Sequence, residues 1–251
     1  MEDRNREEKQ EGRRIVLEKG RFLSWLDNFW YHYKWHTVAV CFVLLILLVC
    51  FVQCGSRETG DVTFAYAGDC NMTQSEYRAF VDSLDALALK KEGEDGTVTV
   101  VLNNYAVYTE AEEEKLRALY KDKDGNFDNL AFQNAWQQSK SNLQTFGDLV
   151  MSGQTALYFV SESVYKYQNL EKLAAPLSDY FETPPAAAYG DGYAIRLADT
   201  EFYKYYEALH FLPENTLVVL TKPYIFGTTS DETTYQYFED LFLGVVNFKA
   251  P

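Results

Sequence analysis

After residue 60 the chain alternates short β-branched or aromatic runs with longer stretches whose apolar residues recur at helical spacing. The short runs predict strands at residues 61–67, 97–102, 156–160, 193–197 and 216–220. The longer stretches predict helices at residues 73–89, 110–120, 129–150, 161–173, 200–209 and 231–247, the first of them opened by a capping box of Thr73 and Glu76. Alternating strands and helices favour an α/β fold, a three-layer domain with a mostly parallel five-stranded sheet.

A different pattern precedes this domain. Residues 37–52, TVAVCFVLLILLVCFV, are apolar except for Thr37, and no charge lies between Lys34 and Arg57. With its flanking residues the run reaches the roughly 30 Å of a bilayer core, and four aromatic rings precede it, where such rings prefer the headgroup layer. We therefore expect a transmembrane helix at residues 36–54, a charged tail at 1–35 and an α/β domain at 55–251.

Three alternatives compete with a membrane-spanning anchor. A buried core helix rarely stays uncharged over this length. A cleaved signal peptide normally has a short basic start, whereas here a charged region more than thirty residues long and rich in Glu precedes the run. A lipoprotein would use Cys54, but Gln53 stands where a small residue is normally required. The anchor is favoured, and the sequence leaves open whether Cys54 carries lipid.

Charge determines the expected orientation and excludes one class of partner. The net charge is -14, and residues 1–34 hold 8 Lys and Arg against 7 Asp and Glu, which leaves 15 against 30 for the rest. An acidic domain repels phosphate backbones, so nucleic acid is not an expected partner. Because basic residues concentrate before the apolar run, we expect a single-pass cell-membrane protein with a cytoplasmic N-terminus and the domain outside.

The sequence offers no positive sign of catalysis, metal binding or a cofactor. Cys70 is the one cysteine clearly inside the domain and His210 its one histidine, which leaves neither a disulfide framework nor a histidine zinc site. The Gly turns at 92–96 and 122–126 lack the spacing of an EF-hand loop, and nucleotide-binding and hydrolase motifs are absent from the sequence. We expect a non-enzymatic protein.

A family resemblance supports a binding function. Residues 149–180, LVMSGQTALYFVSESVYKYQNLEKLAAPLSDY, resemble a segment of type II extracytoplasmic solute-binding proteins, in which a helix ending in a Gly turn feeds a strand, a short helix and a PLSD-like stretch. The chain is also similar to uncharacterised membrane-anchored proteins of Gram-positive bacteria, in its YHYKWHT and GDCN segments. The resemblance implies one lobe of a solute-binding protein. The alternative is a structural module that binds an envelope protein and no small molecule.

Ligands of open α/β sheets bind beyond the carboxyl ends of the strands, where the strand order reverses. That rule selects the turns after the first three predicted strands, and their polar residues are Asp69, Asn71, Asn103, Asn104 and Ser161. The same residue types also cap helices and build turns. The Tyr-rich segments 203–207 and 235–239 are alternative binding surfaces, although tyrosines more often pack where a helix meets a sheet.

The orientation is testable with protease added to intact cells or spheroplasts. Because the basic residues precede the anchor, fragments after Gly55 are expected to be digested while the N-terminal tail is spared. An epitope at each terminus makes the two parts visible on a blot. Protection of the large domain, with loss of the N-terminal epitope, would reverse the proposed orientation.

Overall fold

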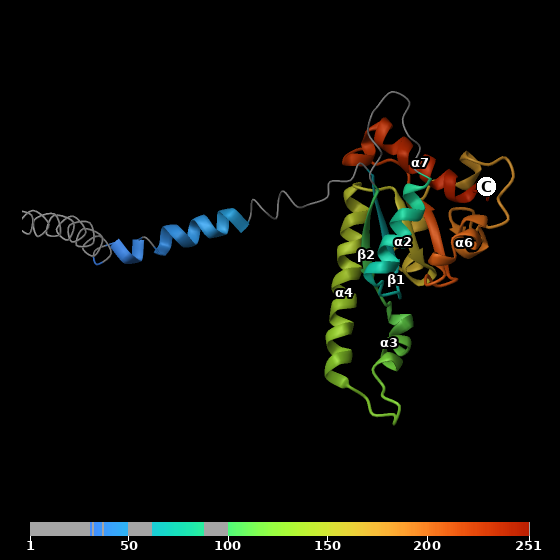
Figure 1. The fold of residues 1–251 in the computed structure, drawn as a ribbon. Coiled ribbons are helices and arrows are strands. Elements are labelled where there is room, and N and C mark those ends of the chain that lie inside the picture. The colour runs from blue at the N-terminus through green and yellow to red at the C-terminus, as the bar shows by residue number, and fades with distance from the viewer. Residues whose placement is uncertain (1–30, 32, 37, 50–61, 88–99, 251) are drawn as a thin grey trace, which may run out of the picture. The chain divides into compact units, whose positions relative to one another are not determined.

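The computed structural model describes residues 31, 33–36, 38–49, 62–87 and 100–250 (Figure 1). The chain divides into two units, Met1–Glu58 and Thr59–Pro251, and each is described by itself. In the first unit, residues 33–36 and 38–49 are helical.

The predicted transmembrane segment lies only partly within the described residues, because Thr37 and 50–54, with Cys54, fall outside them. Among the residues described, no helix combines the length and the apolar content that crossing a bilayer requires. The division into 1–35, 36–54 and 55–251 therefore stays a prediction.

The second unit is an α/β domain around a five-stranded sheet. The strands are β1 (Val62–Gly68), β2 (Val100–Ala106), β3 (Leu157–Ser161), β4 (Ile195–Arg196) and β5 (Thr216–Leu220), in the order β2-β1-β3-β5-β4. Strand β1 pairs in parallel with β2 and β3, whereas β5 is antiparallel to both β3 and β4. The prediction of a mostly parallel sheet is thus corrected to a mixed sheet, since β5 runs against its neighbours.

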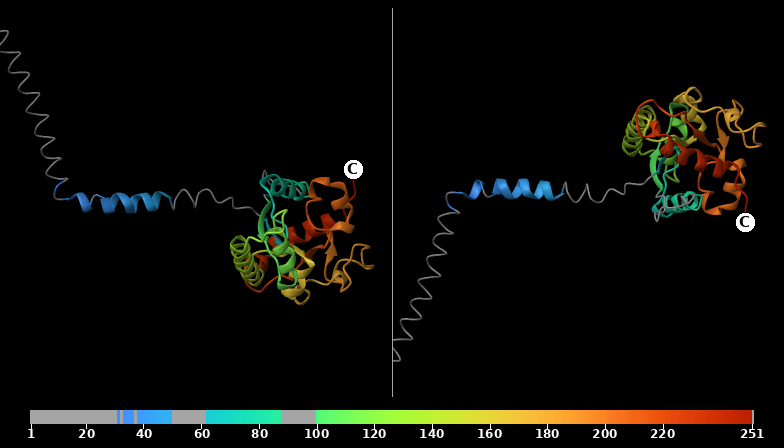
Figure 2. Two further views of the ribbon diagram at one scale, coloured as in Figure 1. Left: turned by 90° about the horizontal axis from the view of Figure 1, so that it is seen from below. Right: turned by 90° about the horizontal axis from the view of Figure 1, so that it is seen from above.

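Helices cover both faces of the sheet, which confirms the three layers (Figure 2). One face is covered by α2 (Gln74–Asp85), α6 (Glu201–Tyr205) and α7 (Glu232–Val246). The other is covered by α4 (Asn129–Ser152) and α5 (Glu162–Tyr167).

Local signals explain where the main helices begin and end. The predicted capping box of α2 is present: the Thr73 amide donates to the Glu76 carboxylate at 2.7 Å, and the Thr73 hydroxyl accepts from the Glu76 amide. The Asp128 side chain accepts from the Ala131 amide to start α4, and Gly153, at φ 63°, ends it in the left-handed conformation that glycine adopts most readily.

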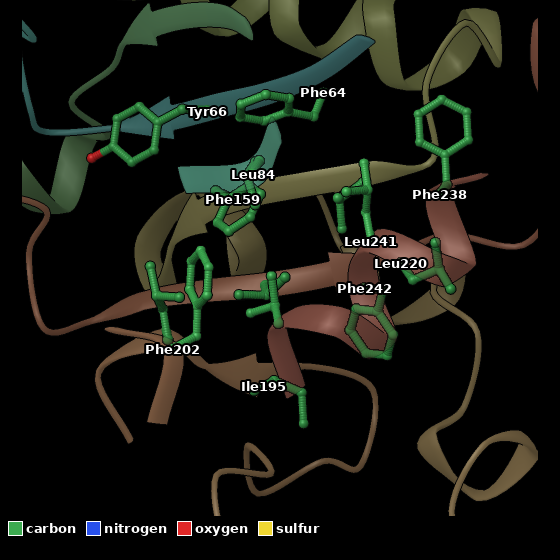
Figure 3. Close-up of a cluster of buried hydrophobic side chains, with 14 of the residues drawn as sticks. Phe64, Tyr66, Leu84, Phe159, Ile195, Phe202, Leu220, Phe238, Leu241 and Phe242 are labelled. Atoms are coloured by element: carbon green, nitrogen blue, oxygen red, sulfur yellow. The ribbon is translucent and has the colours of Figure 1, made fainter. Parts of the chain in front are cut away.

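The sheet side chains alternate between two buried clusters. Phe64 of β1, Phe80 of α2 and Phe159 of β3 meet edge to face, with ring centroids 4.9 to 5.6 Å apart. Figure 3 shows Phe64 and Phe159 in this cluster. On the other face, Ala65 and Ala67 make room for Phe146 of α4. Small residues on one side of β1 and large ones on the other let both helical layers approach the same strand.

Some element boundaries differ from those predicted. Strand β2 continues to Ala106, four residues beyond the predicted end. The predicted helix 110–120 is a 3-10 turn followed by α3 (Glu113–Leu119). The predicted helix 200–209 is α6 followed by a 3-10 turn at Glu207–Leu209.

The phenylalanine cluster should carry much of the domain stability. Phe159→Ala removes a fully buried ring with contacts on two elements and should lower the free energy of unfolding by about 3–5 kcal/mol. The matched control Phe226→Ala acts on a side chain that is 83% exposed and should change it by less than about 0.5 kcal/mol. Urea unfolding measures both. Equal losses in the two variants would show that burial of Phe159 is not what stabilises the domain.

Candidate functional site

The strand order reverses at β1, since β2 lies on one side of it and β3 on the other. All three strands point the same way, so their carboxyl ends meet at one edge of the sheet, termed here the carboxyl edge. In open α/β sheets this is the place where ligands bind.

A groove of about 480 Å³ opens beside this edge, on the face covered by α4 and α5. Its lining combines aromatic rings, amides and one charge of each sign: Tyr108, Glu110, Trp136, Lys140, Leu143, Gln144, Gly147, Tyr167 and Gln168. Tyr108 follows β2, the central residues belong to α4, and Tyr167 and Gln168 end and follow α5. The volume is within the range of small-molecule sites.

The wall of the groove on α4 is held by packing. The buried Trp136 ring lies nearly parallel to that of Phe132, with an interplanar angle of 11°, and the Lys140 ammonium lies 5.0 Å from the Trp136 ring centroid. Across the groove, Gln168 donates to the Leu143 carbonyl, which ties the end of α5 to α4. A Cβ at Gly147 would approach the Gln168 amide to 3.2 Å, so glycine allows these two segments to lie close together.

The opposite face of the same edge holds a set of buried oxygens without hydrogen bonds. Among the residues that the structure describes, these atoms are Tyr66 Oη, Asp69 Oδ1, Asn104 Oδ1 and Thr216 Oγ1. The Tyr66 ring extends over Gly68, where a Cβ would lie 2.6 Å from the hydroxyl, and the hydroxyl points away from the phenylalanine cluster (Figure 3). Buried oxygens of this kind need water or a ligand as partner.

Tyr108 lines the groove and also contacts the segment that follows β1. Its hydroxyl donates to the Asp69 carbonyl at 2.9 Å, and its amide donates to the Ser139 hydroxyl of α4 at 2.7 Å. Burial, and then the nearby Asp69 carboxylate, raise the pKa of Tyr108 to about 12, so its phenol stays protonated and remains a donor at neutral pH. The Asp69 carboxylate itself pairs with Lys115 of α3.

Two of the predicted site residues precede α2. The Asp69 side chain is 1% exposed and lies at the carboxyl edge as expected, but it faces Lys115 and not the groove. Asn71 is exposed. The capping box uses the amides of Thr73 and Glu76, and the Glu76 carboxylate there repels an anion. The helix start is therefore a poor anion site.

The other three predicted residues are placed differently from the expectation. Asn103 and Asn104 lie within β2, paired with Ala65 and Tyr66, and not in a turn after it. Because strand side chains alternate, the two asparagines point to opposite faces and cannot share one ligand. Ser161 is buried and caps α5, accepting from the Val164 amide, which is the capping role weighed above.

None of the five predicted residues lines the groove. The missed residues carried a usable signal, since Trp136, Lys140 and Gln144 recur every four residues and share one face of α4. Tyr108 lies four residues beyond Asn104, the last residue of the predicted turn, and carried no comparable signal.

The other candidate features are structural. The Tyr203 and Tyr235 hydroxyls donate to the carbonyls of Leu212 and Thr221, as packing tyrosines do. Asp122 accepts from the backbone amides of Asp124 and Asn126 within its own turn. The turn at 92–96 lies outside the described residues, and among those described no three His, Cys, Asp or Glu side chains converge as metal ligands.

Comparison of the chain with protein-family models, with curated proteins and with solved structures finds no match. The candidate site therefore rests on geometry.

The thiol at the carboxyl edge should be a poor nucleophile. Burial, and then the carboxylates of Glu76 and Asp69, raise the pKa of Cys70 to about 11. At pH 8 its alkylation by iodoacetamide should be about two orders of magnitude slower than that of an ordinary thiol, and it should accelerate as the pH approaches 11. Peptide mass spectrometry isolates Cys70 from the other cysteines, with the urea-unfolded chain as control. Equal rates in folded and unfolded chains would contradict this environment.

Proposed function

We propose that this chain is a membrane-anchored extracytoplasmic binding protein that holds a small polar solute in the groove between α4 and α5, without catalysis. The observation that carries the proposal is the groove itself, about 480 Å³ in volume and located beside the reversal of strand order. Sites of this size and position are where α/β domains hold ligands.

The lining favours a neutral or zwitterionic solute. The rings of Tyr108 and Tyr167 offer flat apolar surfaces, and the Gln144 and Gln168 amides both donate and accept hydrogen bonds. Glu110 and Lys140 supply one charge of each sign, so the lining has no net charge. A sugar or an amino acid satisfies such a mixture of stacking surface, amide groups and balanced charge.

The chemistry of the lining supports binding and not turnover. The groove residues include no histidine, cysteine or serine, so the usual nucleophile and base pairs are absent from the lining. The nearest thiol, Cys70, has a raised pKa and contacts the Phe211 carbonyl on the other face of the sheet. A site without an activated group retains and releases its ligand unchanged.

The membrane anchor in this proposal is supported by the apolar run and by the exposure of its side chains. The large apolar side chains of residues 38–49 have exposed fractions between 41% and 64%. In water such a surface is unfavourable, whereas a bilayer accommodates it. The excess of Lys and Arg before the run favours a cytoplasmic N-terminus and an external domain.

Solute binding is tested with the full chain in detergent, by calorimetric titration with a panel of monosaccharides, disaccharides, amino acids and dipeptides. One of these classes should bind, and Gln144→Ala should weaken its Kd about tenfold by removing a hydrogen bond. The matched control Gln133→Ala lies on α4 outside the groove and should leave Kd unchanged.

Two outcomes would contradict the proposal. If no solute in the panel binds, the protein-binding alternative replaces it. If a solute binds with the same Kd in Gln144→Ala and in Gln133→Ala, the groove is not its site.

A further inference from the structure

Three apolar side chains project into solvent at and beside the C-terminal end of α4. Ile225 and Phe226, in the loop after β5, are 86% and 83% exposed, and Met151, in the last turn of α4, is 67% exposed. Together they are termed here the apolar tip. Exposed apolar side chains that lie together mark an interaction surface more often than scattered ones do.

The loop that carries the tip is fixed to the end of α4. Gly153 contacts the Phe226 carbonyl and the Tyr224 side chain so closely that a Cβ there would come within 2.8 Å of either. The Thr229 amide donates to the Gly153 carbonyl at 3.0 Å, and the buried Thr229 hydroxyl accepts from the Tyr224 amide at 3.3 Å. The backbone is thus held in place while Ile225 and Phe226 point outward.

The reversed direction of β5 determines where this loop lies. Because β5 is antiparallel to β3, and β3 is parallel to β1, the carboxyl end of β5 lies at the same sheet edge as the amino end of β1. In the register of the sheet, Leu220 is opposite Leu157, and Tyr158 is opposite Ala65. The apolar tip and Val62, where the chain enters the domain, therefore share the amino edge of β1.

The chain length limits how far this edge can lie from a bilayer. Only seven residues, 55–61, separate the predicted anchor from Val62. Even fully extended they span roughly 25–30 Å, which is less than the roughly 36 Å length of α4. Of the two sheet edges, the amino edge of β1 is the one that the tether keeps near lipid.

We infer that the apolar tip inserts into the interfacial layer of the bilayer that holds the anchor. The contact is made by apolar side chains and not by attraction between charged groups and lipid headgroups. The inference rests on the anchor in the proposed function. The domain has a large excess of acidic residues, so contact with lipid has to come from apolar side chains, and zwitterionic lipid should suffice. Insertion at this edge would direct the carboxyl edge of the sheet away from the membrane.

Site-specific photocrosslinking tests this contact in the full chain reconstituted in phosphatidylcholine vesicles. Phe226→benzoylphenylalanine should yield lipid adducts, detected by mass spectrometry, at least tenfold above those of Leu130→benzoylphenylalanine. Leu130 is a matched control because it is 73% exposed and lies at the other end of α4, 21 residues from Met151. The adduct yield at Phe226 should be insensitive to salt.

A probe at a third position distinguishes failure of the tip contact from failure of the anchor. Leu45→benzoylphenylalanine probes the apolar run, where lipid adducts are expected if it spans the bilayer. Adducts at Leu45 with equal, low yields at Phe226 and Leu130 would overturn the tip contact while the anchor stands. Absence of adducts at Leu45 would overturn the anchor and the tip contact with it. Crosslinks from Phe226 to a second protein chain in place of lipid would show that the tip is a protein interface, which contradicts the inference.

Discussion

Strand β1 has to be hydrogen-bonded along both of its sides, because its backbone is buried in the middle of the domain and unpaired amides there are costly. Strand β2 satisfies one side and β3 the other, both in parallel. The chain passes from β1 to β2 through α2 on one face, and then from β2 across β1 to β3 through α4 on the other, so the two connections leave the carboxyl edge of the sheet and separate to opposite faces. The groove lies beside that separation, so the pairing of one buried strand determines where a ligand can be held.

The two faces of the sheet are packed differently. On the face of α2 and α7, large rings such as Phe64 and Phe159 fill the core, and the Tyr66 ring reaches past them over Gly68. On the other face, small residues of β1 let α4 pack closely. Because α4 is longer than the strands, its first half extends beyond the sheet beside α3 (Figure 1), where Phe132 and Trp136 form a buried cluster with Leu116 of α3.

Local signals in the sequence were enough to predict the α/β class, the five strands and the capped start of α2. They did not predict the direction of β5, because the run Thr216–Leu220 is buried along its whole length and such a run is equally suited to either direction. Asn103 and Asn104 are typical of turns, yet continued pairing with β1 keeps them in β2. The direction of β5 and the place of the two asparagines in β2 both depend on pairing between strands that are far apart in the sequence. A local sequence pattern carries no information about that pairing.

The difference between local signals and long-range arrangement also applies to the candidate site. The rule about strand order proposes an edge of the sheet and depends on topology, whereas the residues that line the groove depend on which face of α4 turns toward the end of α5. Trp136 illustrates the difficulty, since an indole on a predicted helix suggests core packing, and here the ring is both buried against Phe132 and part of the groove wall.

The central claim is that the carboxyl edge, on the side of α4 and α5, is the binding surface. The most direct measurement is a map of backbone amide chemical shifts, by nuclear magnetic resonance, during titration with whichever solute binds. The account predicts that the largest shifts concentrate at Tyr108, at the stretch of α4 from Trp136 to Gly147, and at Gln168. Shifts concentrated at the amino edge of β1, or spread over the Tyr-rich helices with the groove unaffected, would contradict it.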